Sequence, residues 1–188
     1  MKRSVWGGAL AVTVGVTVAA CGGSGGPADD AHAADPPESA SPAPSAGVPA
    51  EPGPALGMCG SVTDAELAAT TEITLPLTAV RDTVGCQWDV GLVDLGSHVS
   101  FTWYRGSPIG RERAIDGAVG RVVQDVTVAG QPGFSSQADS SLCEVGVQYG
   151  ADFFLWSVSY GVDEPSPPAG GVCDVAMTLA TMTAERAG

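Results

Sequence analysis

The sequence predicts an α+β fold in which an antiparallel sheet of about five strands is flanked by three helices, in the order α-β-β-α-β-β-β-α. Three observations lead to this expectation. Short runs that alternate apolar and polar residues are typical of half-buried strands, and the short turns between them favour antiparallel pairing. Apolar residues recur at helical spacing in separate segments. Four widely spaced cysteines, Cys59, Cys86, Cys143 and Cys173, favour two disulfides.

The first helix and the first hairpin follow from local patterns. Thr63 stands three residues before Glu66, the spacing of a capping box, so a helix is expected from there to about residue 70. Residues 86–90 and 98–104 then alternate apolar and polar side chains. These two runs predict a hairpin of half-buried strands.

A second helix is expected over residues 107–124, beginning at a Ser-Pro pair. Its apolar face would consist of Ile115, Ala118, Val119, Val122 and Val123. A short strand follows at residues 126–128. The Gly- and Pro-rich residues 130–133 are expected to end that strand as a turn.

The last elements are a hairpin and a helix. Residues 142–149 and 153–160 alternate and are separated by a short turn. The second of these runs is apolar on both faces, which is typical of a central strand covered on both sides. Residues 172–185 carry an apolar stripe at helical spacing and predict the C-terminal helix.

The N-terminal 20 residues predict a bacterial lipoprotein signal peptide. Lys2 and Arg3 precede an apolar run over residues 5–20, which is too short for a membrane-spanning helix. Residues 18–21 (Val-Ala-Ala-Cys) resemble the bacterial lipobox, whose cysteine accepts a diacylglyceryl group. We therefore expect cleavage before Cys21 and lipid anchoring on the extracytoplasmic face of the cell membrane. Two acyl chains on that residue would give stable anchoring.

The rest of the chain divides into a tether and a domain. Residues 21–56 are mostly Gly, Ala, Pro and Ser, with few large apolar side chains to offset the entropy lost on ordering. We expect them to form a lipidated N-terminus followed by a disordered tether. Residues 57–188 are expected to form one globular α+β domain.

The charge of the chain argues against one class of partner. The formal net charge is −13 for the whole chain and becomes −15 without Lys2 and Arg3, when 21 acidic and 6 basic residues remain. Such a surface repels phosphate backbones, which argues against binding to nucleic acid.

The four domain cysteines allow three pairings, because an exported chain with an even cysteine count is expected to form disulfides. We favour Cys59–Cys86 with Cys143–Cys173, since each bond then joins a terminal helix to a nearby strand. No Cys-x-x-Cys motif occurs and histidine is scarce, so neither a metal site nor another cofactor is expected.

Together these features resemble the actinobacterial lipoprotein family typified by the mycobacterial LprB and LprC proteins, a domain of unknown function. The matching motifs include the lipobox, the Thr-Asp-Ala-Glu-Leu run at 63–67, the Gly-Cys-Gln-Trp run at 85–88 and the terminal helix opened by Cys173. The resemblance implies an anchored extracytoplasmic protein and brings no catalytic residues. The element order is also similar to that of Mog1/PsbP-like α/β folds.

Catalytic signals are weak. His98 is the domain's single histidine, and no Gly-x-Ser-x-Gly elbow accompanies it. Residues 117–120 are too short for a dinucleotide loop, and the acidic pair at 163–164 is expected to be solvated. A hydrolase acting on a cell-wall substrate is the alternative function, with Asp89, Asp94 or Asp152 as its acids. That chemistry needs two carboxyl groups roughly 5–10 Å apart in a cleft.

Aromatic residues on the predicted strands are the stronger candidates for a site. Trp88, Trp103, Trp156 and Tyr160 are expected mainly in the core, and the alternative is an apolar cleft that binds a lipid or glycan. The preferred function is a non-catalytic binding or interaction module of the cell envelope, with an envelope protein, lipid or glycan as partner.

Overall fold

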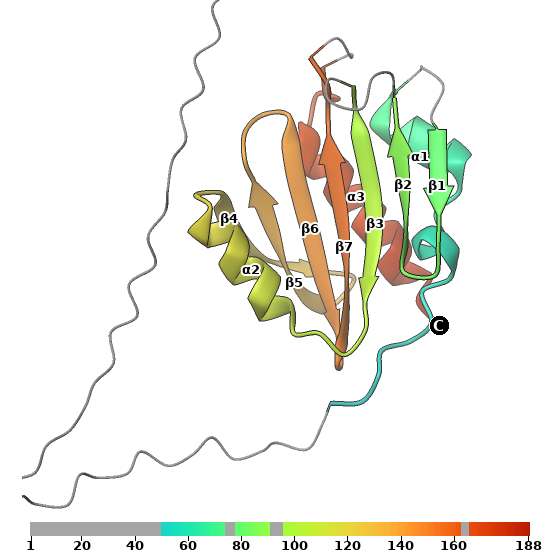
Figure 1. Ribbon diagram of the computed structural model, residues 1–188, viewed down its shortest axis with the longest axis vertical. Helices are drawn as coiled ribbons and strands as arrows, with labels where there is room; N and C mark the ends of the chain where they lie inside the picture. The colour runs from blue at the N-terminus through green and yellow to red at the C-terminus, as the bar shows by residue number, and fades with distance from the viewer. Residues whose placement is uncertain (1–49, 74–77, 91–95, 163–165) are drawn as a thin grey trace, which may run out of the picture. The chain divides into compact units, whose positions relative to one another are not determined.

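In the part of the chain that the structure describes, seven antiparallel strands form one sheet with helices against both faces (Figure 1). The computed structural model describes residues 50–73, 78–90, 96–162 and 166–188. The strands are β1 (Thr78–Arg81), β2 (Gly85–Asp89), β3 (His98–Tyr104), β4 (Val122–Val128), β5 (Gln131–Gln137), β6 (Leu142–Tyr149) and β7 (Asp152–Ser159). The helices are the 3-10 helix η1 (Met58–Ser61), α1 (Asp64–Thr71), α2 (Ile109–Ala118) and α3 (Val172–Glu185). The strand order across the sheet is β1-β2-β3-β7-β6-β5-β4.

The predicted α+β class is confirmed, and both predicted hairpins are present. Strand β2 pairs with β3, and β6 pairs with β7. Thr63 caps α1 in a capping box with Glu66, as its spacing predicted. Strand β7 lies at the centre of the sheet, and its neighbouring Phe153 and Phe154 are both fully buried on opposite faces. This agrees with a strand that is apolar on both sides.

The sheet has seven strands rather than about five because β1 and β5 lack the expected pattern. Strand β1 is a short, largely exposed edge strand with no alternation to detect. Strand β5 contains Pro132 and Gly133, although the sequence predicts a turn at these residues. Pro132 pairs only with β4, so its missing N–H removes no bond to β6. At Gly133 the strands approach so closely that a Cβ atom would collide with the Gly146 carbonyl oxygen.

The second helix is much shorter than predicted. Helix α2 ends at Ala118, and Gly120 follows with a φ of 86°, the left-handed conformation that commonly ends helices. The chain then enters β4 at Val122, inside the range expected to be helical. The expected apolar stripe is wrong, since Ile115, Val119 and Val122 are all exposed.

The hydrophobic core lies between α3 and one face of the sheet. Val145 of β6, Trp156 of β7 and Leu179 of α3 are fully buried there. Helix α1 contacts α3, while α2 lies against the other face and contacts β4, β5 and β6 (Figure 1). The sheet therefore has an apolar face under α3 and a second face that α2 covers in part.

Two disulfides join the helices to the sheet. Cys59 of η1 pairs with Cys86 of β2, and Cys143 of β6 pairs with Cys173 in the first turn of α3. This is the pairing that we favoured, and it is confirmed. The paired cysteines are 27 and 30 residues apart in sequence. Closing loops of that size stabilises a fold by about 3–4 kcal/mol each in the chain-entropy model.

Contacts with the sheet begin before residue 57, where we placed the start of the domain. The Ala151 N–H donates to the Glu51 carbonyl oxygen at 2.8 Å, and the Gly53 N–H donates to Asp152 Oδ2 at 3.1 Å. Leu56 is part of the core. Residues 51–56, assigned to the tether, therefore pack on the domain.

Several sequence predictions lie outside the described residues. These are the signal peptide, Cys21 and most of the tether in residues 1–49, together with Asp94 and the acidic pair at 163–164. Among the helices that the structure describes, none has the length and apolar character needed to cross a membrane.

A surface clamp joins the N-terminus of α1 to the C-terminus of α3. Two guanidinium nitrogens of Arg186 donate to the Glu66 carboxylate at 3.0 and 2.7 Å, and the Thr63 N–H donates to it at 2.9 Å. These bonds, chiefly those from Arg186, lower the pKa of Glu66 from 4.5 to about 2. The clamp therefore contributes its full stability above the unfolded pKa of 4.5, and this is lost as the pH falls toward 2.

We expect Glu66→Gln to lower the urea midpoint of unfolding at neutral pH, because the uncharged amide loses the charge-assisted bonds to Arg186. The difference from wild type should shrink as the pH falls through the acid range, where wild type also loses its carboxylate. Urea unfolding followed by circular dichroism at a series of pH values measures this difference. Glu72→Gln, at the other end of α1, is the matched control because the Glu72 side chain is exposed and takes no part in the clamp. An equally wide gap at neutral and acid pH would contradict the clamp.

Candidate functional site

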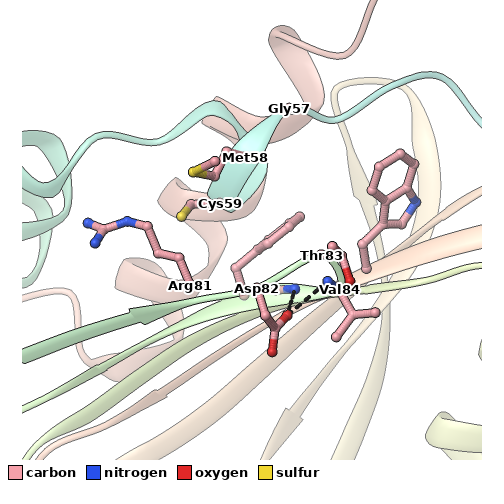
Figure 2. A pocket seen from close by; sticks show the side chains of 10 residues that line it. Gly57, Met58, Cys59, Arg81, Asp82, Thr83 and Val84 are labelled. Atoms are coloured by element: carbon pink, nitrogen blue, oxygen red, sulfur yellow. Dashed lines mark hydrogen bonds between the residues drawn. The ribbon is translucent and has the colours of Figure 1, made fainter.

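An apolar cavity of about 400 Å³ lies at the β1–β2 end of the sheet. Its wall consists of residues 57–59 at η1, residues 81–85 of the β1–β2 hairpin, and Phe101 and Trp103 of β3. In Figure 2, Met58 and Cys59 lie on one side of the cavity, with the hairpin residues on the other. The volume falls within the range of roughly 300–1,000 Å³ that is usual for small-molecule sites. We call this the Trp103 cavity.

The first wall of the Trp103 cavity is a tightly turned segment held by the Cys59–Cys86 disulfide. Gly60, with a φ of 64°, adopts a left-handed conformation that L side chains rarely take. A Cβ atom there would collide with Thr183 Oγ1 of α3 and with the Phe101 ring. Glycine therefore lets η1 pack directly against both α3 and β3. Met58, two residues before Gly60, lines the cavity and is 72% exposed, so it belongs to the rim.

The second wall is the β1–β2 turn. Asp82 Oδ1 accepts hydrogen bonds from the N–H groups of Val84 (2.8 Å) and Gly85 (2.9 Å), as Figure 2 shows by dashed lines. The backbone N–H of Trp103 donates to the Val84 carbonyl oxygen at 2.8 Å. A Cβ atom at Gly85 would collide with the Phe101 carbonyl oxygen, so only glycine allows this close approach to β3. These contacts fix Val84 at the rim, where it is 57% exposed.

The two aromatic residues of β3 play different parts. Phe101 is buried, and its ring centroid lies 5.3 Å from that of Trp156 in the core. Trp103 is half-buried and lines the cavity at its open side. The guanidinium carbon of Arg105 lies 3.9 Å from the centroid of the Trp103 ring, in a cation–π contact. The cavity therefore has a rigid inner wall and an amphipathic aromatic residue at its opening.

An ion pair stands at the outer side of the hairpin. Arg81 Nη2 lies 2.5 Å from Asp64 Oδ1, which also accepts a hydrogen bond from Trp88 Nε1 at 2.9 Å. The bonds from Trp88 and from Arg81 lower the pKa of Asp64. This carboxylate therefore satisfies the indole N–H of a core tryptophan and holds one guanidinium beside the cavity.

Three of the four aromatic candidates lie in the core and not at the cavity. The rings of Trp88 and Trp156 are both fully buried and stack with centroids 5.8 Å apart. Tyr160 donates its hydroxyl to the Thr71 carbonyl oxygen at 2.6 Å, and burial raises its pKa to about 12. Enclosed side chains offer no surface to a ligand, so these three lie in the core, as mainly expected, and the alternative of a ligand contact does not hold for them. Only Trp103 stays a candidate for ligand contact.

Two of the acids proposed for hydrolysis, Asp89 and Asp152, lie far apart in the described structure. Asp89 pairs across the sheet with His98, which pairs with Ser159 at the end of β7, whereas Asp152 begins β7. Seven strand residues separate these two ends by roughly 20 Å. That separation exceeds the distance required between a catalytic acid and its carboxylate partner.

Both acids have local partners instead. His98 Nδ1 lies 2.8 Å from Asp89 Oδ1, and Gln87 Nε2 donates to Asp89 Oδ2 at 2.9 Å. Partial burial raises the pKa of Asp89, but the bonds from His98 and Gln87 outweigh this and leave it below its ordinary value. Asp152 is buried and accepts bonds from the N–H groups of Gly53 and Gly106. Its role here is to hold two loops against the sheet.

Two carboxylates that sequence reasoning missed do meet beneath α2. Asp116 and Glu144 both contact Arg121 Nη1, at 3.2 and 2.5 Å, and Ser157 Oγ donates to Glu144 at 3.0 Å. Burial raises the pKa of Glu144 against the opposing effect of Arg121. Because the guanidinium bridges the two acids, the cluster ties the end of α2 to the sheet.

No group of three His, Cys, Asp or Glu side chains is placed to hold a metal ion among the described residues. Of the residues that line the Trp103 cavity, sequence reasoning named Cys59 and Trp103, and only Trp103 as a ligand contact. The Asp82-Thr83-Val84-Gly85 run is a turn signal that would have predicted the β1–β2 hairpin. The remaining wall residues carry no pattern of their own, because their proximity arises from the disulfide and the sheet.

We expect Trp103→Phe to remove most of the tryptophan fluorescence that acrylamide quenches, because Trp88 and Trp156 are enclosed by the core. The measurement uses the chain from residue 21 onward with Cys21→Ser, which omits Trp6. Trp88→Phe is the control and should leave the quenchable intensity unchanged, because it removes only enclosed fluorescence. Unaltered quenching in Trp103→Phe would show that the cavity is closed to small molecules.

Comparison with known proteins supports the family resemblance. The family model described as "Protein of unknown function (DUF3558)" matches residues 16–186. Lipoprotein LprB of Mycobacterium bovis is 42% identical over 132 residues, which cover 68% of this chain and 69% of that protein. LprB of Mycobacterium tuberculosis is 41% identical over 132 residues, which cover 68% of this chain and 69% of that protein. LprB of Mycobacterium leprae is 40% identical over 125 residues, or 64% of this chain and 66% of that protein.

No solved structure matches the chain significantly, so the likeness to Mog1/PsbP-like folds stays a prediction. The sequence relatives share the name lipoprotein, in agreement with the resemblance stated from the motifs. The family match covers the Val-Ala-Ala-Cys motif at 18–21, all four domain cysteines and every described strand and helix. The chain therefore belongs to the DUF3558 family of proteins of unknown function.

Proposed function

We propose that this protein is a lipid-anchored binding module of the bacterial cell envelope, and that it holds an apolar ligand in the Trp103 cavity without chemical change. The cavity is the observation that carries the proposal. It is built mainly from apolar side chains, it opens to solvent, and it has Trp103 at its opening. Sites of this kind bind the apolar part of small molecules by burying it away from water.

The anchor rests on the N-terminal sequence and on the relatives. Residues 18–21 form the lipobox, and the family match begins at residue 16, so the predicted lipidation site at Cys21 is inside the matched region. Relatives at 40–42% identity carry the name lipoprotein. A membrane anchor would keep the domain close to the lipids of the envelope, its most abundant source of apolar ligands.

The described acids favour binding over hydrolysis. Asp89 and Asp152 lie at opposite ends of β7, and Asp116 and Glu144 are bridged by Arg121. None of these four carboxylates lines the Trp103 cavity. A hydrolase would need such a pair in its cleft.

The anchor is tested with Cys21→Ser. This change removes the thiol that would accept the diacylglyceryl group, so the protein should leave the membrane fraction and lose the mass of its lipid. Cell fractionation and intact-mass measurement report the two effects. Cys59→Ser, in the domain, is the control and should not alter the lipid mass. The anchor would be refuted if Cys21→Ser stayed in the membrane with unchanged mass.

The cavity is tested with an uncharged amphiphile, dodecyl maltoside, held below its critical micelle concentration. We expect Val84→Asp to weaken binding roughly tenfold, because a carboxylate at the rim must be desolvated when the alkyl chain enters. Titration of the Cys21→Ser protein, followed by calorimetry, measures the affinity.

Val122→Asp is the matched control for that experiment. Val122 is 61% exposed and Val84 57% exposed, but Val122 lies on β4 at the opposite edge of the sheet. Its substitution adds the same charge and should leave the affinity unchanged. Equal affinities in both variants would place the bound chain elsewhere and overturn the proposed site.

A further inference from the structure

The arginines of the domain fall into two groups. Four of the six in the described residues form ion pairs with carboxylates: Arg81, Arg113, Arg121 and Arg186. The other two, Arg105 and Arg111, make no ion pair with any described carboxylate. Arg105 lies over the ring of Trp103, a residue of the cavity wall, whereas Arg111 lies on α2, which contributes no residue to that wall.

The position of Arg105 is set by its neighbours on both sides. On one side, its guanidinium lies over the ring of Trp103, which lines the cavity. On the other side, the Gly106 N–H donates to the buried carboxylate of Asp152 at 2.8 Å. The backbone is therefore held immediately after Arg105. Its guanidinium lies against the ring of the cavity residue Trp103 and forms no ion pair with any described carboxylate.

A second guanidinium lies in the cavity wall. Arg81 lines the cavity while one of its nitrogens contacts Asp64. The one carboxylate among the lining residues, Asp82, accepts two backbone N–H bonds within its own turn. Such bonds offset part of its negative charge. The cavity thus combines an apolar interior with cationic groups at its edge.

We infer that the ligand of the Trp103 cavity is a single-chain amphiphile with an anionic head group, whose alkyl chain enters the cavity while its phosphate or carboxylate binds Arg105. This inference rests on the proposed function. A guanidinium binds phosphate or carboxylate oxygens through two parallel N–H bonds, and its contact with Trp103 orients it for that purpose. The acidic surface elsewhere repels anions, so the head group is directed to this one opening.

The experiment compares head groups on one alkyl chain. The protein is the chain from residue 21 onward with Cys21→Ser, so that no acyl chain of its own competes. Calorimetric titrations use dodecyl phosphate, dodecyl maltoside and dodecyltrimethylammonium, each below its critical micelle concentration, and inorganic phosphate alone. We expect dodecyl phosphate to bind about tenfold or more tightly than the maltoside, the cation to bind most weakly, and free phosphate not to bind.

Two matched variants assign the effect to one side chain. Arg105→Gln should weaken the affinity for dodecyl phosphate about tenfold and leave the affinity for dodecyl maltoside within about a factor of two. Arg111→Gln removes the same charge from the same domain and should change neither. Arg105→Lys keeps the charge and should recover part of the affinity, which also excludes misfolding as the cause. Circular dichroism checks that all three variants are folded.

The outcomes separate this inference from the proposed function. If the amphiphiles bind equally well and Arg105→Gln has no effect, the anionic head group is refuted while the apolar site stands. If no amphiphile binds, the proposed function fails as well. If inorganic phosphate binds as tightly as dodecyl phosphate, the site is one for free anions and the inference is overturned.

Discussion

Packing of α3 on the central strands is the interaction on which the rest of the structure depends. Val145, Trp156 and Leu179 are fully buried along this contact, where apolar surface is removed from water on both layers. The Cys143–Cys173 disulfide ties the start of α3 to β6, and Trp156 Nε1 donates to Thr183 Oγ1 near its end, at 3.0 Å. The helix is thus fixed near both of its ends, and one wall of the Trp103 cavity packs against it.

The Trp103 cavity depends on that packing. Gly60 lies against both Thr183 of α3 and the ring of Phe101, and Phe101 in turn packs on Trp156. One wall of the cavity is therefore a direct extension of the core. The opposite wall, around Val84, is held by backbone bonds and the turn at Asp82. A firm inner wall and an exposed apolar rim together suit a site that binds by burial.

The acidic composition has a structural explanation in many places. Asp152 holds two loops through backbone N–H groups, Asp82 closes the β1–β2 turn, and Glu66 joins α1 to α3. Glu144 belongs to the ion cluster under α2. These carboxylates are engaged with partners of the same chain, whereas Arg105 forms no ion pair with any described carboxylate and lies over Trp103 instead.

Local patterns in the sequence determined the lipobox motif at Cys21, the cap at Thr63, two hairpins, α3 and the α+β class, because each depends on neighbouring residues alone. Strand β5 escaped prediction because Pro132 and Gly133 are typical of a turn, although Pro132 pairs with Thr127 of β4 and Gly133 approaches Gly146 of β6 closely. The early end of α2 escaped it because the apolar residues from Val122 onward belong to β4. The disulfide pairing was favoured from the expected elements, but it was decided by which elements lie side by side. The cavity itself belongs entirely to the tertiary structure, because η1, the β1–β2 turn and Trp103 meet there only after the sheet and α3 have packed.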